Sequence, residues 1–253
     1  MSSFQSVDEL NGKVAVIIGG NGAVGFATAK RLAKLGATCV LIGRHSLEKE
    51  VEQIKQLPPG KHFCLNASIT DSATLIAAAK EVERRVGRCD ILVNSAGFTK
   101  PVPAADLDAL TDDLIDEVLK ANFRGVFASI RAFQQLLKAN GDGLVVNVSS
   151  IAGFTGVGSN LAYVAAKASL DIVSESLAKV LAPEIRVLCV SPGVVDSGFV
   201  PGRGADFNDK TAATTPLKRI GTPDDVAAAI EACATRLRFS TGTRIVVDGG
   251  RHL

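Results

Sequence analysis

The sequence predicts an α/β fold: a doubly wound, seven-stranded parallel sheet with helices on both faces. Two observations indicate it. Seven short runs rich in Val, Ile and Leu alternate with longer amphipathic stretches, and alternating strands and helices are typical of a parallel sheet. The apolar runs also lack a polar residue at every second position, which is the pattern of strands buried on both faces.

The predicted strands are residues 13–19, 38–43, 62–66, 91–95, 144–149, 185–191 and 244–248. Predicted helices over 23–35 and 71–86 end before Gly36 and Gly87, and glycine suits the left-handed residue that closes a helix. In such a sheet, ligands bind beyond the carboxyl ends of the strands. We therefore expect functional motifs directly after strands.

Length and composition limit the classes of function. The 253 residues fit one domain spanning 1–253. Net charge is +2 without a Lys/Arg run, and no segment is long and apolar enough to span a membrane, so we expect neither nucleic acid nor a membrane as partner. The first ten residues lack the pattern of a secretory signal, and we expect a cytoplasmic protein. Five scattered cysteines and three histidines predict no metal site.

Glycines cluster between the first predicted strand and the first predicted helix. The order Gly20-x-Gly22-x-x-Gly25 allows a tight turn and lets backbone N–H groups approach a pyrophosphate at the helix N-terminus. In this position it predicts a Rossmann-like dinucleotide site, although a plain tight turn would need the same glycines. The predicted cofactor contacts here are Gly19, Asn21, Gly22, Ala23, Val24 and Gly25.

The end of the second predicted strand indicates which dinucleotide is bound. Arg44 stands where an acidic residue would hold the ribose 2′-hydroxyl of NAD(H). A guanidinium can pair with the 2′-phosphate of NADP(H) instead. We therefore expect NADP(H) to be favoured over NAD(H), the alternative being a solvated arginine in a loop.

Tyr163 and Lys167 carry the predicted chemistry. They are four residues apart in an alanine-rich stretch, so a helix would place them on one face. A phenol with an ordinary pKa near 10 needs a nearby cation to act at neutral pH. Ser150 closes the fifth predicted strand thirteen residues before Tyr163.

With this Ser-x12-Tyr-x3-Lys spacing, the sequence resembles the short-chain dehydrogenase/reductase superfamily, in its single-domain branch of about 250 residues. The resemblance implies that Tyr163 is the acid/base, that Lys167 lowers its pKa and contacts the nicotinamide ribose, and that Ser150 orients the carbonyl. It assigns Asn122 to a proton-relay water and implies a homotetramer. It adds as cofactor contacts Asn94, Ala96, Gly97, Pro192, Gly193, Val195 and Ser197.

Some positions depart from the family pattern. The usual T-G-x-x-x-G-x-G reads here as residues 18–25, without the threonine and the middle glycine. Ser68 replaces a common aspartate that contacts adenine, and Leu188 replaces a frequent asparagine. Ser95 and Ser197 replace a frequent asparagine and threonine. The proton chemistry is therefore better supported than the cofactor contacts.

These residues predict an oxidoreductase that interconverts a ketone and a secondary alcohol. The alternatives are a 3-oxoacyl thioester reductase, an epimerase or dehydratase with a tightly held cofactor, and a non-catalytic NADP(H)-binding regulatory protein. Residues 196–215 have no sustained apolar period and predict a lid over the substrate, in which Arg203 and Lys210 could meet an anion. The predicted apolar pocket consists of Phe98, Phe154, Val157 and Phe199.

Overall fold

The computed structural model describes residues 9–44 and 52–253. Its sheet has seven parallel strands in the order β3-β2-β1-β4-β5-β6-β7, which confirms the predicted fold class. The order changes direction between β1 and β4, and this switch point opens a crevice at the carboxyl ends of the two strands. The strands are β1 (Val14–Ile18), β2 (Thr38–Gly43), β3 (Phe63–Asn66), β4 (Ile91–Asn94), β5 (Gly143–Val148), β6 (Ile185–Pro192) and β7 (Thr243–Val247).

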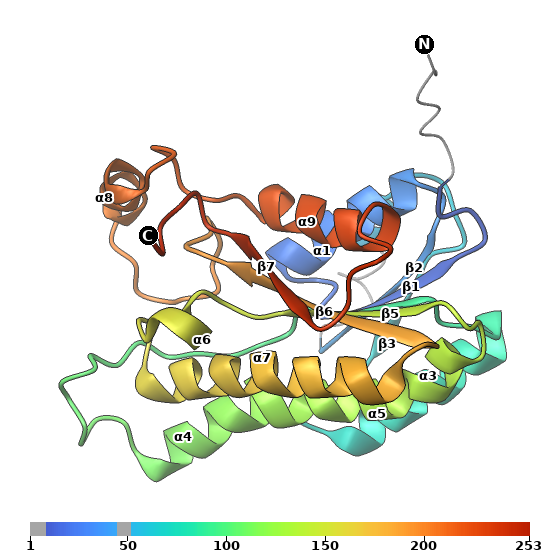
Figure 1. The fold of residues 1–253 in the computed structure, drawn as a ribbon, viewed down its shortest axis with the longest axis horizontal. Coiled ribbons are helices and arrows are strands. Elements are labelled where there is room, and N and C mark those ends of the chain that lie inside the picture. The colour runs from blue at the N-terminus through green and yellow to red at the C-terminus, as the bar shows by residue number, and fades with distance from the viewer. Residues whose placement is uncertain (1–8, 45–51) are drawn as a thin grey trace.

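Helices cover both faces of the sheet (Figure 1). On one face α1 (Ala23–Lys34) packs against α9 (Pro223–Thr235), and on the other α3 (Ser72–Val86), α5 (Gly125–Lys138) and α7 (Leu161–Leu181) lie side by side. The helix α4 (Asp112–Leu119) continues through a π-helical turn, η1 (Lys120–Arg124), into α5. In the part of the chain that the structure describes, every helix is too short or too polar to cross a membrane.

The central strands supply a hydrophobic core on each face. Val14, Val16 and Ile18 of β1 pack into the cluster beneath α3, α5 and α7. Ala15 and Ile17 of the same strand pack into the cluster beneath α1 and α9. Successive side chains of a strand point to opposite faces, so a strand covered on both faces needs apolar residues at every position.

Local signals set the helix ends. The side chain of Asp71 accepts hydrogen bonds from the backbone N–H groups of Ala73 and Thr74, so Asp71 caps α3 and the helix begins one residue later than predicted. Gly87 ends α3 and Gly36 follows α1, with φ of 68° and 89°. Both glycines adopt the predicted left-handed conformation.

The predicted lid contains regular structure. Residues 207–214 form the helix α8 (Phe207–Thr214), of which only Thr211 is buried. A helix with one buried position shows no sustained apolar period, which explains why the sequence did not predict it. Next to this region lies the short helix α6 (Ala152–Thr155), which follows β5.

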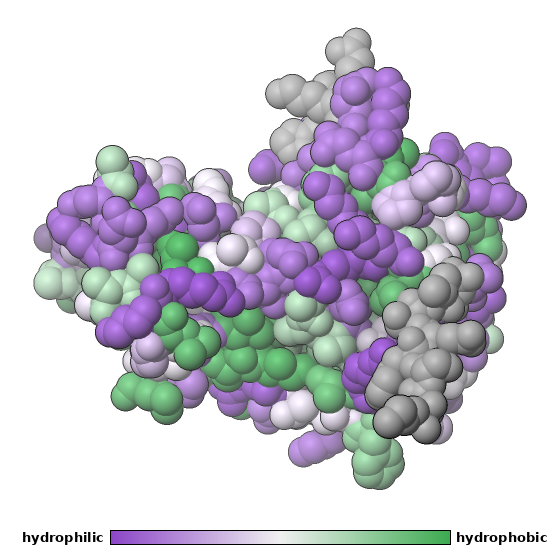
Figure 2. Space-filling model, turned by 90° about the horizontal axis from the view of Figure 1, so that it is seen from above, coloured by the Kyte–Doolittle hydropathy of each residue, from purple (hydrophilic) through white to green (hydrophobic). Residues whose placement is uncertain are grey.

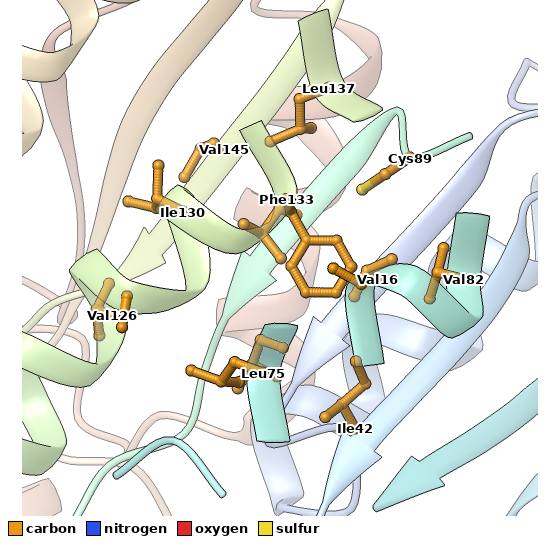
Figure 3. Packing of buried hydrophobic residues seen from close by; sticks show 14 of the residues in the cluster. Val16, Ile42, Leu75, Val82, Cys89, Val126, Ile130, Phe133, Leu137 and Val145 are labelled. Carbon is orange, nitrogen blue, oxygen red and sulfur yellow. The ribbon is translucent and has the colours of Figure 1, made fainter. Parts of the chain in front are cut away.

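The side chain of Phe133 in α5 is completely buried at the centre of the cluster beneath α3, α5 and α7 (Figure 3). We expect Phe133→Ala to lower the free energy of unfolding by about 3–5 kcal/mol, because it leaves a cavity in a close-packed interior. Chemical denaturation measures this loss. The matched variant Phe239→Ala, at a fully exposed phenylalanine, should change stability by no more than about 0.5 kcal/mol; equal losses would contradict the packing described above.

Candidate active site

A cavity of about 1340 Å³ opens at the carboxyl ends of the central strands. Its walls come from the turn before α1, the segments that follow β4, β5 and β6, the start of α7, the predicted lid and the C-terminus. It therefore lies at the switch point, as expected for this sheet. The predicted site residues that line it are Gly22, Ala23, Val24, Gly25, Ala96, Gly97, Ser150, Tyr163, Lys167, Pro192, Gly193, Val195 and Ser197.

Tyr163 lies in the first turn of α7, where a buried asparagine fixes the backbone. The side chain of Asn160 caps α7 by accepting a hydrogen bond from the N–H of Tyr163 at 2.7 Å. Its amide nitrogen donates to the carbonyl oxygen of Lys100 at 2.8 Å. The cap thus ties the start of α7 to the segment that follows β4.

Lys167 lies one turn further along α7, and its side chain is almost completely buried. Its ammonium group is 5.5 Å from the centroid of the Tyr163 ring, and it donates a hydrogen bond to the carbonyl oxygen of Val148 at 2.8 Å. Burial lowers the pKa of Lys167 to about 8, since the low-dielectric interior disfavours the charged form. The predicted helical spacing does bring the phenol and the ammonium together.

Ser150, at the end of β5, completes the group. Its Oγ accepts a hydrogen bond from the N–H of Ala152 at 3.1 Å and interacts with the phenol of Tyr163. Burial raises the pKa of Tyr163 to about 12, and the hydrogen bond with Ser150 opposes that rise. The phenol therefore holds its proton at neutral pH.

Asn122 lies in the π-helical turn and is fully buried. Its Nδ2 donates to the carbonyl oxygens of Phe98 and Val118, at 2.6 and 2.9 Å, and its Oδ1 accepts from the N–H of Phe98 at 3.4 Å. A Cβ atom on Gly97 would come within 2.6 Å of this Oδ1. Asn122 is outside the cavity lining and holds the Gly97–Phe98 segment, of which Gly97 forms part of the wall.

Asn94 also lies behind the cavity wall. Its Nδ2 donates to Oδ1 of Asn147 at 2.9 Å, and its Oδ1 accepts from the hydroxyl of Ser129. The amide of Asn147 donates in turn to the hydroxyl of Ser174 at 2.9 Å. Both asparagines are fully buried, so their polar groups must find partners inside the protein. The Asn94 side chain is thus directed into the core.

The glycine-rich turn fits a pyrophosphate. Gly22 caps α1 without a side chain, and the first turn of the helix carries no acidic residue, so its N–H groups can donate hydrogen bonds to an anion. A Cβ atom on Gly25 would lie 2.2 Å from the carbonyl oxygen of Gly19. Gly19 itself has a φ of 81° and packs against the backbone of Ala96. Gly19 and Asn21 lie outside the cavity lining, and the carbonyl oxygen of Gly19 accepts a hydrogen bond from the N–H of Gly22 at 3.0 Å.

Arg44 is exposed directly after β2. It lies outside the cavity lining, one strand away from the glycine-rich turn, because β2 pairs in parallel with β1. Residues 45–51, which follow it, lie outside the described part of the chain.

The structure selects among the residues predicted to meet the substrate. Phe199 and Val157 line the cavity, and the Phe199 ring centroid is 6.1 Å from that of Tyr163. Phe98 instead packs against the cluster between α4 and α7, and Phe154 lies edge-on to the ring of His252. These two phenylalanines are outside the lining, so their prediction as pocket residues was wrong.

Two basic residues of the predicted lid have different positions. Arg203 lines the cavity. Lys210 is exposed, forms an ion pair with Asp206 one turn earlier on the surface of α8, and lies outside the lining. Only Arg203 is therefore placed to meet a bound anion, and the expectation for Lys210 was wrong.

The C-terminal residues of the cavity were not predicted from the sequence. Arg251 and His252 line the cavity, and the C-terminus lies beside α8 (Figure 1). Gly249 and Gly250 turn the chain toward it with φ of 66° and 85°, and Asp248 accepts hydrogen bonds from the N–H and ring of His252, both at 2.8 Å. The paired glycines were the available signal for this turn.

Asp171, one turn after Lys167 on α7, was also missed. It is buried and forms an ion pair with Arg244 of β7 at 3.3 Å. Burial raises the pKa of Asp171 above its ordinary value, and the Ser149 hydroxyl and the charges of Arg244 and Lys167 oppose this rise. Its i, i+4 spacing from Lys167 was the signal that could have indicated it.

Known proteins share this architecture over most of the chain. A family model described as enoyl-(acyl carrier protein) reductase matches residues 20–252. A granaticin polyketide synthase protein of Streptomyces violaceoruber, named as a ketoacyl reductase, is 32% identical over 98% of this chain and 99% of its own. The 3α-hydroxysteroid dehydrogenase of Mediterraneibacter gnavus is 31% identical over 95% and 97%. A crystal structure from Burkholderia xenovorans, assigned to the short-chain dehydrogenases/reductases, superposes with a TM-score of 0.88 at 30% identity, covering 94% and 97%.

Tyr163 is the only tyrosine, and the chain contains no tryptophan, so the ultraviolet absorbance of phenolate reports this one side chain. In the protein without cofactor we expect the absorbance to appear only as the pH approaches about 12. Because the folded-state pKa is raised above its ordinary value of about 10, the proton-donating form persists through neutral and mildly alkaline pH.

The control for this titration is Ser150→Ala. It removes the hydrogen bond that lowers the pKa of Tyr163, so the phenolate should appear at still higher pH. Circular dichroism at each pH confirms that the protein remains folded. A folded wild-type protein that titrates at or below pH 10 would refute the proposed environment of Tyr163.

Proposed function

Because the chain belongs to the short-chain dehydrogenase/reductase superfamily, we propose that it is an NADP(H)-preferring oxidoreductase that interconverts a ketone and a secondary alcohol. One observation carries the proposal: Tyr163, Lys167 and Ser150 converge in a cavity whose other wall is the open N-terminus of α1. Relatives named as a ketoacyl reductase and a hydroxysteroid dehydrogenase support the same type of reaction.

In the direction of reduction, Tyr163 gives its proton to the carbonyl oxygen. The Ser150 hydroxyl donates a hydrogen bond to the same oxygen and stabilises the negative charge that develops there. Lys167 stabilises the tyrosinate that remains, since its ammonium group is 5.5 Å from the ring centroid. When bound, the nicotinamide cofactor supplies the hydride, or accepts it in oxidation.

Asn122 contributes to the reaction by positioning the Gly97–Phe98 segment of the cavity wall. Its amide is bonded to both backbone groups of Phe98, and it thereby holds Gly97 in the wall of the cavity. The π-helical turn between α4 and α5 directs this side chain into the protein, and such turns are frequent at functional sites. The family resemblance adds a relay water to this role.

The cofactor would extend from the N-terminus of α1 to the segment after β6. The N–H groups that follow Gly22 would hold the pyrophosphate, and Arg44 would pair with the 2′-phosphate of NADP(H). The nicotinamide end would lie against Gly97 and the segment 192–197. The lining residues of this second segment are Pro192, Gly193, Val194, Val195 and Ser197.

A second candidate is a 3-oxoacyl thioester reductase. The relative named as a ketoacyl reductase supports it. The site chemistry would be unchanged, because a 3-oxoacyl group also presents a ketone. A non-catalytic NADP(H)-binding protein would have no use for the converged phenol, ammonium and hydroxyl.

We also propose a homotetramer, as the family resemblance implies. Apolar side chains are exposed on the outer faces of two adjacent helices: Phe127 on α5, and Leu161, Ile172 and Val180 on α7. An exposed apolar surface of this kind is typical of protein–protein interfaces.

We expect Tyr163→Phe to lower kcat for ketone reduction by about 10²–10⁴-fold, because it removes the proton donor and leaves the ring in place. Turnover is measured from the absorbance of NADPH, and the Kd for NADPH should stay unchanged. The control is Ser176→Ala, which removes an exposed α7 hydroxyl bonded within its own helix. Full turnover by Tyr163→Phe would exclude the acid/base role.

The cofactor preference is tested at Arg44. Arg44→Asp should lower kcat/KM for NADPH by about 10–100-fold and spare NADH, because it replaces a charge-assisted phosphate contact with a repulsive carboxylate. Arg84→Gln is the control, since Arg84 lies on the surface of α3 paired with Glu81. A wild-type enzyme that prefers NADH would overturn the proposed NADP(H) preference.

A further inference from the structure

We propose that Arg203 binds an anionic oxygen group, a carboxylate or a phosphate, that the carbonyl substrate carries at a distance from its ketone. This inference rests on the proposed function and specifies the substrate class. It follows from the signs of the charges in the cavity, the surroundings of Arg203, and its place beside the apolar end of the site.

The charged residues that line the cavity are all basic. Lys167, Arg203 and Arg251 contribute cations and His252 an imidazole, and within residues 9–44 and 52–253 no aspartate or glutamate lines it. A concave site with charges of one sign attracts ligands of the opposite sign. The pyrophosphate of a dinucleotide would bind at the N-terminus of α1. The basic residues on the lid side of the cavity are therefore available for a different anion.

Arg203 is held in place by contacts that leave most of its donors available. One Nη donates to the carbonyl oxygen of Val195 at 2.9 Å, and the guanidinium lies 4.6 Å from the centroid of the Phe207 ring. Among the described residues, no carboxylate lies within ion-pair distance of it. The nearby Asp196 carboxylate accepts instead from the amide of Asn208 at 2.9 Å.

The Arg203 guanidinium, which has a carbonyl oxygen and an aromatic ring as neighbours, is partly removed from water. Burial lowers its pKa below the ordinary value, with Asp196 opposing, and its Nε is buried without a hydrogen-bond partner. A charge in such surroundings gains free energy from a bound counter-ion. Guanidinium also binds carboxylate and phosphate through two parallel hydrogen bonds.

The other basic groups at this end either have an acidic partner or, like Arg251, are exposed to solvent, whereas Arg203 is half-buried. His252 is hydrogen-bonded to Asp248, and Arg251 donates to the hydroxyls of Thr214 and Thr215 at 3.1 and 3.5 Å. Lys210 is paired with Asp206 outside the cavity. These differences favour Arg203 over its neighbours as the anion-binding residue.

Arg203 lies away from the part of the cavity assigned to the cofactor phosphates. It stacks on Phe207 at the start of α8, whereas the glycine-rich turn precedes α1; the two helices are separated in Figure 1. Phe199, four residues before Arg203, lies against the Tyr163 ring. Figure 2 shows green, hydrophobic residues adjoining purple, hydrophilic ones on the left-hand side, where α8 lies. An apolar body linking a ketone at Tyr163 to an anion at Arg203 matches this arrangement.

Two pairs of ketones test the proposal, and each pair differs in charge alone or chiefly in charge. The first is 4-oxocyclohexanecarboxylate and its methyl ester, which tests a carboxylate. The second is acetoacetyl-4′-phosphopantetheine and acetoacetyl-pantetheine, which differ by one phosphate and test a phosphate on a thioester carrier. Values of kcat/KM are measured with saturating NADPH for the wild type, R203Q, R203K and the control K210Q.

We expect the wild type to favour the anionic member of at least one pair by about tenfold or more. R203Q should lower kcat/KM for that anion by about 10–100-fold, mainly through KM, and change the neutral partner by less than about threefold. R203K should recover part of the loss, because it restores the charge without the planar fork. K210Q should match the wild type for all four ketones.

Three results would overturn the proposal: no preference for the anion in either pair, equal losses on both members of a pair in R203Q, or a raised Kd for NADPH in R203Q, which would assign Arg203 to the cofactor. If no ketone is turned over, the proposed function fails separately. Calorimetry on the NADP+ complex then decides the inference, with cyclohexanecarboxylate and coenzyme A as anions and methyl cyclohexanecarboxylate as the neutral control. An anion should bind the wild type more tightly than R203Q, and equal binding would refute the role of Arg203.

Discussion

A buried ammonium group is the constraint on which the site depends. Lys167 is almost completely buried and within 5.5 Å of the Tyr163 ring centroid. Burial disfavours the charge of Lys167 and raises the pKa of the Tyr163 phenol, so hydrogen bonds from neighbouring groups stabilise both side chains. The carbonyl oxygen of Val148 at the end of β5 accepts such a bond from the Lys167 ammonium group. The position of α7 relative to β5 therefore determines where the ammonium group lies beside the phenol.

The polar groups behind the cavity keep that register. Asn94 of β4 and Asn147 of β5 are bonded to each other, and Asn147 is bonded to Ser174 of α7. These bonds join two strands and a helix at fixed positions, because buried amides that lose a partner cost free energy. Burial of the apolar clusters on the two faces of the sheet drives the layers together. The hydrogen bonds of the buried amides determine the positions at which the two strands and the helix align.

The fold class and the central part of the site were predictable from the sequence. The role of Ser150 was implied by the family resemblance. Continuous apolar strands, the glycines before α1, and the four-residue spacing of Tyr163 and Lys167 are local patterns. Each acts through neighbours in the chain or through a regular helix or strand period. Their geometry follows once the secondary structure forms, which is why these predictions needed no knowledge of distant contacts.

Only the tertiary structure decided which other residues reach the cavity. Phe98 and Phe154 lie outside its lining, Arg203 faces it while Lys210 pairs on the surface of α8, and the C-terminal residues 251–252 fold back to it. The sequence established the residues able to carry the chemistry, through period and spacing. Packing between segments far apart in the chain decided which of them meet, because a side chain's direction depends on the neighbours that bury it and on the partners left for its polar groups.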